Sequence, residues 1–206
     1  MKDFSLETKK VIIFDLDGTI VHLKADWMSL KSKLAEKYNT LYDDKCNFHS
    51  ISACLSKIVE RNDEKALEDF FNVIRHYEHE SIEENQPIKE SIFFINNRYL
   101  FAIDKDTKFA ILSLNTRNTI IKSLKLAKIF EKVDFIVGRE DVRKWKPDPE
   151  GLIKIKSHYK LKDEEMIYFG DLENDLKTGK NANIETYYID ELINLVNKKK
   201  SELKIF

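Results

Sequence analysis

The stretch Val11-Ile-Ile-Phe-Asp-Leu-Asp-Gly-Thr-Ile20 places a short apolar run directly before two aspartates and a glycine. The run is continuous rather than alternating, which is typical of a strand in a parallel sheet that is covered on both faces. Side chains two positions apart in an extended segment point the same way, so Asp15 and Asp17 are expected to project together from the strand end. The glycine that follows lets the chain turn sharply away from the sheet.

Similar apolar runs recur farther along the chain and predict further strands at Phe109–Leu114, Phe135–Val137, Met166–Phe169 and, with a weaker pattern, Thr186–Ile189. Helical patterns alternate with these strands at Thr116–Lys128, Asp148–Tyr159 and Asn174–Ala182, and a last helix is expected from Asp190 to about Leu203. This alternation predicts an α/β fold with a Rossmann-like, doubly wound parallel sheet.

The interval from Ile20 to about Pro87 contains no convincing strand. Its periodicity predicts amphipathic helices at about Asp26–Tyr38, Ser50–Asn62 and Asp63–Ile82, with a further short helix near Asp44. Such an insertion is too long for a single crossover between neighbouring strands. We therefore expect residues 1–20 and 88–206 to form the α/β core and residues 21–87 to form a small all-helical domain.

Composition narrows the class of protein. The 206 residues include 35 basic and 36 acidic side chains, a balance that gives no global field toward nucleic acid or an acidic membrane. The first residues lack an apolar signal core, and no run approaches the ~18 apolar residues of a membrane span. Cys46 and Cys54 fit neither a zinc spacing nor a disulfide framework. We therefore expect reduced thiols and a soluble, cytoplasmic protein.

Ligands of open parallel sheets bind beyond the carboxyl ends of the strands, where this chain carries further polar residues. The second predicted strand leads to Ser113 and Asn115, the loop after the third supplies Lys146, and the fourth is followed by Asp171 and Asp175. Converging carboxylates suit magnesium, while a hydroxyl and a lysine suit the oxygens of a phosphoryl group. Asp175 on an exposed helix face is the alternative interpretation for that residue.

These motifs, in this order, resemble the haloacid dehalogenase-like superfamily, and specifically its phosphatase branch. Asp-Leu-Asp-Gly-Thr resembles the first motif of that family, and Ser113 in Ala-Ile-Leu-Ser-Leu-Asn resembles the second. Lys146 in Trp-Lys-Pro-Asp-Pro resembles the third, and Gly170-Asp-Leu-Glu-Asn-Asp175 the fourth. The resemblance spans residues 11 to 175. It implies a small helical cap, inserted after the first motif, that closes over the site.

The resemblance also implies roles for the acidic residues. Asp15 would attack phosphorus and form an aspartyl-phosphate, and Asp17 would protonate the leaving oxygen and then activate water. Mg²⁺ would be bound by Asp15, by the backbone carbonyl of Asp17 and by Asp171, with Asp175 joining or supporting these ligands. Family members that cleave carbon–halogen bonds lack a carboxylate at the position of Asp17, so its presence favours phosphate chemistry.

Ser113 and Lys146 would hold the phosphoryl oxygens. Asn115 belongs to the same predicted phosphate-binding set, although it could equally satisfy the loop before a helix that Thr116 caps. At the entrance to the helical domain, His22, Lys24 and Trp27 could face substrate; cap packing for Trp27 and a solvated position for Lys24 are the alternatives. His22 stands where many capped relatives carry an aspartate, which leaves the substrate open.

The sequence thus predicts a magnesium-dependent phosphatase that hydrolyses a small phosphorylated metabolite. A phosphomutase using the same intermediate is one alternative. A catalytically inactive binding or regulatory protein of the same fold is another, which the intact acidic set disfavours.

Overall fold

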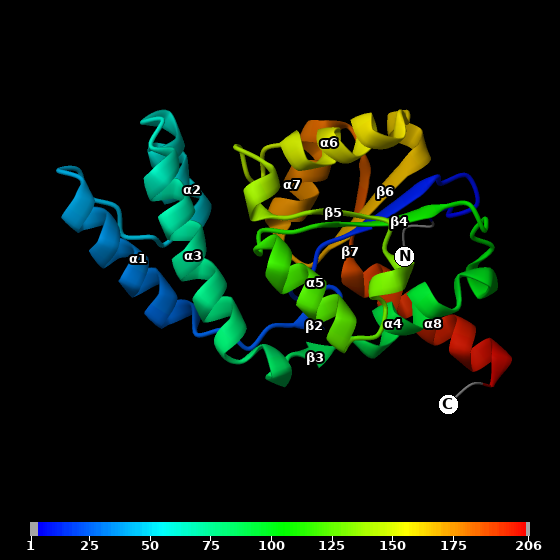
Figure 1. Cartoon of the computed structure of the whole chain (residues 1–206). Coiled ribbons are helices and arrows are strands. Elements are labelled where there is room, and N and C mark those ends of the chain that lie inside the picture. The colour runs from blue at the N-terminus through cyan, green and yellow to red at the C-terminus, as the bar shows by residue number, and fades with distance from the viewer. Residues whose placement is uncertain (1–3, 205–206) are drawn as a thin grey trace.

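The computed structural model describes residues 4–204 and contains the predicted parallel sheet (Figure 1). Its strands are β1 (Val11–Phe14), β4 (Lys108–Leu112), β5 (Phe135–Val137), β6 (Met166–Gly170) and β7 (Glu185–Tyr188). They lie in the order β5-β4-β1-β6-β7, and every neighbouring pair is parallel. The first strand, β1, therefore lies at the centre and delivers Asp15 to the middle of the carboxyl edge.

Helices cover both faces of this sheet, as the continuous apolar runs predicted. One face carries α4 (Lys89–Asn96), α5 (Arg117–Leu126) and α8 (Ile189–Leu203), and the other carries α6 (Glu150–Tyr159) and α7 (Glu173–Ala182). Ile12 and Phe14 pack into the first layer, while Val11 and Ile13 pack into the second. Each position of β1 is thus buried on one side of the sheet or the other.

The insertion forms α1 (Trp27–Leu41), α2 (Ile51–Glu60) and α3 (Glu64–Glu80), which stand to one side of the sheet in Figure 1. Each helix begins after a residue whose side chain accepts a hydrogen bond from a main-chain N–H three positions later. These capping residues are Asp26, Ser50 and Asp63. Such caps satisfy amide groups that a helix start leaves unpaired, which explains why the helices begin where they do.

Aromatic packing holds the inserted helices together, and a short ribbon connects them to the sheet domain. Phe48 and Phe70 stack with ring centroids 5.6 Å apart, and Tyr38 meets both rings edge-on. The chain enters through β2 (Val21–His22) and returns through β3 (Gln86–Pro87), which pair antiparallel. Pro87, near which the sequence predicts the return of the chain, lies in β3 opposite Val21.

Short 3₁₀ turns complete the described elements: η1 (Ile82–Glu84), η2 (Arg98–Phe101), η3 (Phe130–Lys132), η4 (Arg139–Asp141) and η5 (Asp163–Glu165). Within residues 4–204, no helix combines the length and the apolar character that crossing a membrane requires.

Four sequence expectations are wrong. The interval from Ile20 to about Pro87, expected to contain no strand, holds the two-residue strands β2 and β3. The segment around Asp44 is irregular rather than helical. Cys46 and Cys54 form a disulfide, with Cα atoms 6.0 Å apart, rather than remaining reduced thiols. The chain between them turns back through Phe48, whose φ of 55° lies in the left-handed region. The predicted strand at Phe109–Leu114 ends earlier, at Leu112, which leaves Ser113 in the loop beyond β4.

Candidate active site

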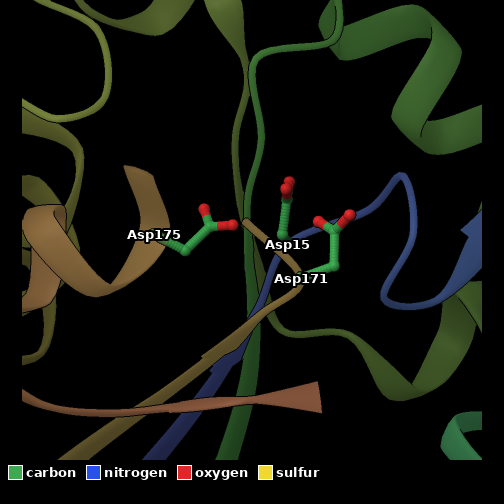
Figure 2. Close-up of side chains that lie close together, drawn as sticks. All are labelled: Asp15, Asp171 and Asp175. Atoms are coloured by element: carbon green, nitrogen blue, oxygen red, sulfur yellow. The ribbon is translucent and has the colours of Figure 1, made fainter. Parts of the chain in front are cut away.

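Three carboxylates converge beyond the carboxyl ends of β1 and β6. Asp15 follows β1, Asp171 follows β6, and Asp175 lies in the first turn of α7. Each offers an oxygen within 4.8 Å of the other two, and Figure 2 shows Asp15 between its two neighbours. Asp175 is 1% exposed, so its alternative placement on an exposed helix face is wrong.

Two glycines make this convergence possible. Gly18 has a φ of 74°, and a Cβ atom there would lie 2.3 Å from an oxygen of Asp171. A Cβ atom at Gly170 would lie 2.4 Å from the Cβ of Asp175. A side chain at either position would therefore force the neighbouring aspartate out of its present place. The turn after β1 and the end of β6 are therefore shaped to admit the two carboxylates.

Lys146 is the cation of this cluster. Its Nζ lies 3.0 Å from Asp15 and 2.6 Å from Asp175, and it donates to the Tyr168 hydroxyl at 2.8 Å. Burial disfavours the ammonium, but the two carboxylates outweigh burial and raise the pKa of Lys146. Arg143 and Lys144, its basic neighbours, are exposed.

The carboxylates differ in their affinity for protons. Burial, opposed by Lys146, raises the pKa of Asp15 to about 6. Burial together with the charges of Asp15 and Asp175 raises the pKa of Asp171 to about 7. Burial also acts on Asp175, but Lys146 and the donated hydrogen bonds outweigh it and lower its pKa. A negative charge on Asp171 is therefore the least compensated of the three.

Asp17 lies outside this trio. One of its carboxylate oxygens accepts a hydrogen bond from the main-chain N–H of Leu23 at 2.9 Å. Burial raises the pKa of Asp17, which favours its protonated form near neutral pH more than that of a free aspartate. Its side chain nevertheless lines the same cavity as Asp15.

Ser113 and Asn115 belong to a buried hydrogen-bond network that reaches the inserted helices. The Ser113 hydroxyl donates to the side-chain oxygen of Asn115 at 2.9 Å, and the amide of Asn115 donates to Glu78 at 2.9 Å. The other oxygen of Glu78 accepts bonds from Thr116 and Thr119. The Thr116 hydroxyl therefore donates to Glu78 and does not cap α5. Asn115 links Ser113 to Glu78, which is more than satisfying the groups of its own loop.

Glu78, on α3, is 2% exposed and was not singled out in the sequence. Its partners lie 37 to 41 positions away, so no local pattern could have revealed it.

A cavity of about 430 Å³ opens over these residues. The inserted helices and their loops contribute Trp27, Lys31, His49, Ser50, Ile51 and Ser52 to its wall. Of the predicted contacts at the entrance, the structure therefore places Trp27 on the cavity. His22 and Lys24 are exposed and are not part of the described lining.

Arg139 also lines the cavity and was missed by the sequence reasoning. It is the second residue after β5, at the same carboxyl edge of the sheet as Asp15 and Ser113, which directly follow their strands. Its place beyond the end of a predicted strand could therefore have singled out Arg139 from the sequence. The cavity-lining stretch from His49 to Ser52 gave no such signal, because the disulfide and the turn around it bring it to the site.

The acidic trio fits a divalent cation. Asp171 has a buried Oδ1 without a hydrogen-bond partner in the described part of the chain. Both oxygens of Asp175 already accept bonds, from Lys146, Tyr168 and Leu172. An unpaired buried carboxylate oxygen beside two further carboxylates is a donor set suited to a hard divalent cation.

Comparison with known proteins agrees with this geometry. The pyrophosphatase PpaX of Halalkalibacterium halodurans is 28% identical over 183 residues, which cover 85% of this chain and 80% of that protein. Two solved structures share the fold. A Bacteroides fragilis protein, provisionally described as a haloacid dehalogenase-like hydrolase, has a TM-score of 0.62 at 22% identity and covers 86% of both chains.

A second structure, provisionally described as a phosphoglycolate phosphatase from Lactobacillus plantarum, has a TM-score of 0.61 at 12% identity. It covers 96% of this chain and 99% of that one. The sequence profile of the haloacid dehalogenase-like hydrolases matches residues 12–189, most of the chain. The chain therefore belongs to the haloacid dehalogenase-like hydrolase family.

Proposed function

We propose that this enzyme is a magnesium-dependent phosphatase that hydrolyses a small phosphorylated metabolite through an aspartyl-phosphate on Asp15. The observation that carries the proposal is the position of Asp15. Its carboxylate ends the central strand, 3.0 Å from Lys146 and within 4.8 Å of oxygens of Asp171 and Asp175. A nucleophile needs positive charge that offsets the approaching phosphate; Lys146 supplies part of it, and a divalent cation held by the three carboxylates would supply the rest.

In the first step, an oxygen of Asp15 attacks phosphorus, and the bond between phosphorus and the leaving oxygen breaks. Asp17 gives its proton to that oxygen. Its raised pKa keeps a larger fraction of Asp17 protonated than in free aspartate, which suits a general acid. Lys146 holds the phosphoryl oxygens, joined by the Ser113 hydroxyl once its single hydrogen turns from Asn115 to the phosphoryl group.

In the second step, Asp17, now ionised, takes a proton from a water molecule as that water attacks phosphorus. The bond between phosphorus and Asp15 breaks, which releases inorganic phosphate and restores both aspartates. One carboxylate thus acts as nucleophile while its neighbour serves in turn as acid and base.

Asp15 and Asp171, with the backbone carbonyl of Asp17, would hold the magnesium ion, and Asp175 would orient the site because its oxygens already accept other bonds. When bound, the ion would offset negative charge on the phosphoryl oxygens. The helices α1 to α3 would act as a cap that shields the site, because their loops form one wall of the cavity.

Phosphate release from p-nitrophenyl phosphate in the presence of Mg²⁺ tests this proposal. Asp15→Asn should lower turnover by at least about a thousandfold while leaving the circular dichroism spectrum unchanged. Asp106→Asn is the matched control, because Asp106 is exposed in the loop before β4. It should retain full activity.

Two further readouts complete the test. A chelator should stop the reaction and added Mg²⁺ should restore it. With a sugar phosphate as substrate, a phosphatase forms inorganic phosphate, whereas a mutase forms an isomeric sugar phosphate. Wild-type turnover by Asp15→Asn, or full activity in chelator, would contradict the proposal.

A further inference from the structure

Arg139 is held rigidly beside the phosphate-binding loop. Its main-chain N–H donates to the carbonyl of Asn115 at 2.9 Å. Its own carbonyl accepts a bond from the indole of Trp145 at 2.8 Å. The position is therefore fixed from two sides, and the side chain starts from the same strand edge as Ser113.

The guanidinium of Arg139 is buried in the cavity wall and largely uncommitted. The residue is 4% exposed, yet Nε and Nη1 have no hydrogen-bond partner within residues 4–204. Burial lowers the pKa of Arg139, because the cation has lost water without gaining a direct partner. A buried cation of this kind is costly unless an anion pairs with it.

The acidic neighbours of Arg139 are engaged elsewhere. Glu78 and Glu140 supply the nearby negative charge, but neither forms an ion pair with Arg139 in the described structure. Glu78 accepts bonds at both of its oxygens from the network of Asn115. Glu140 pairs with Arg75 at 3.3 Å and accepts from the main chain of α5 at 2.8 Å.

Lys146 and Arg139 therefore differ in kind, although both line the same cavity. Lys146 is neutralised by two carboxylates of the catalytic cluster and lies where the reacting phosphoryl group would bind. Arg139 is free to bind something else. A guanidinium is a planar fork of donors that matches a carboxylate or a phosphate through paired hydrogen bonds.

We propose that Arg139 binds a second acidic group of the substrate. The proposal rests on the phosphatase function proposed above and narrows its substrate class. The preferred substrates would be small molecules that carry, beside the phosphoryl group to be transferred, a further phosphate or carboxylate. Inorganic pyrophosphate and short phosphorylated carboxylic acids have this chemistry.

Steady-state kinetics of Arg139→Gln with three substrates tests the proposal. p-Nitrophenyl phosphate has no second acidic group, phosphoglycolate has a carboxylate, and inorganic pyrophosphate has a second phosphate. We expect kcat/KM to fall about 10- to 100-fold for at least one of the two diacidic substrates, mainly through KM. For p-nitrophenyl phosphate it should change less than about 3-fold. The substrate that loses more identifies the second group as carboxylate or phosphate.

Two companion variants separate binding from folding. Arg139→Lys keeps the charge but not the fork and should recover part of the lost kcat/KM. Arg143→Gln removes an exposed arginine four positions along the same segment, which contacts Glu64 on the surface. It should leave all three substrates unaffected. An equal loss on every substrate, or no loss on any, would overturn the proposal.

Binding measured without turnover distinguishes failure of this inference from failure of the phosphatase function. Calorimetric titration with inorganic pyrophosphate and with inorganic phosphate should show a loss of pyrophosphate affinity in Arg139→Gln and little change for phosphate. If the wild type hydrolysed none of the substrates but showed this selective binding, the phosphatase function would fail and the second-anion site would stand. Equal affinity of wild type and variant for both pyrophosphate and phosphoglycolate in such titrations would reject the site.

Discussion

Ionisation of Asp171 lowers the stability of the folded protein. Its folded pKa of about 7 lies above the ordinary value of 3.8, because burial and two neighbouring carboxylates disfavour ionisation. Between these values the folded protein binds a proton more tightly than the unfolded chain does. The stability contribution of the protonated group is therefore present at low pH and is lost as the pH rises through about 7. A cation that binds the folded protein reverses this loss.

Urea unfolding of metal-free protein measures the effect. We expect the free energy of unfolding to fall between pH 5 and pH 8, and Asp171→Asn to unfold at higher urea than wild type at pH 8. The expected gain is about 1–3 kcal/mol, since an uncompensated buried carboxylate is removed. The same variant should lose magnesium-dependent activity. A wild type that gains stability across this pH range, or a destabilised variant at pH 8, would contradict this interpretation.

The affinity for Mg²⁺ should depend on pH through the protonation of Asp15 and Asp171. Because the ion needs ionised carboxylates, it must displace the protons that Asp15 and Asp171 hold up to pH 6 and 7 respectively. Calorimetry should show tighter Mg²⁺ binding at pH 8 than at pH 6, with proton release at the lower pH. Equal affinities at the two pH values would show that these carboxylates are not the ligands.

At the scale of elements, α3 and α5 meet through Glu78. One carboxylate oxygen of Glu78 accepts a hydrogen bond from the amide of Asn115. The other accepts hydrogen bonds from the hydroxyls of Thr116 and Thr119, at the start of α5. Helix α3 is thus hydrogen-bonded to the loop that presents Ser113. The network connects α3 to the residues proposed to bind phosphate, because Asn115 is hydrogen-bonded to both Glu78 and Ser113.

Glu78→Gln tests this coupling. The amide has one acceptor oxygen, so either Asn115 or the threonines of α5 would face a donor instead. We expect about 1–3 kcal/mol less stability in urea and a higher KM for every phosphorylated substrate. Glu80→Gln is the matched control, since Glu80 is exposed on the same helix. Unchanged KM and stability in Glu78→Gln would show that the network does not position the loop.

The loop before α2 is the second element with a testable role. The disulfide between Cys46 and Cys54 encloses the segment that carries His49, Ser50, Ile51 and Ser52 to the cavity. Closing so short a loop contributes roughly 2–3 kcal/mol by restricting the unfolded chain. Dithiothreitol should therefore lower the melting temperature and raise KM, while the double variant Cys46→Ser/Cys54→Ser should not respond. Two free thiols in the native protein would contradict the pairing.

At the scale of the whole molecule, much of the fold could be predicted because local signals agree with it. The buried run from Val11 to Phe14 and its four counterparts specify the sheet, and Asp26, Ser50 and Asp63 specify where the inserted helices begin. The helix α4 was missed. Its apolar run, Ser91-Ile-Phe-Phe-Ile95, is too short for its periodicity to separate helix from strand.

The residues of the candidate site likewise fall into those that local sequence signals predict and those that they do not. Asp15 and Asp171 follow strands directly, and Lys146 and Asp175 lie on the segments that continue from the ends of β5 and β6. Residues beyond the carboxyl ends of parallel strands gather at one edge of the sheet, so their convergence could be predicted. Glu78 and the disulfide could not be predicted, because each depends on how distant or irregular segments pack. Arg139 also follows a strand, but its role became visible only through its burial and unpaired nitrogens.

The central claim is that Asp15 carries the phosphoryl group during turnover. Rapid acid quenching of wild-type enzyme with Mg²⁺ and substrate, followed by borohydride reduction, converts an aspartyl-phosphate into homoserine, which peptide mass spectrometry locates. We expect homoserine at position 15 in the wild type and none in Asp15→Asn or without substrate. Homoserine at another aspartate, or steady turnover with no modified residue at position 15 under any quench time, would contradict the claim.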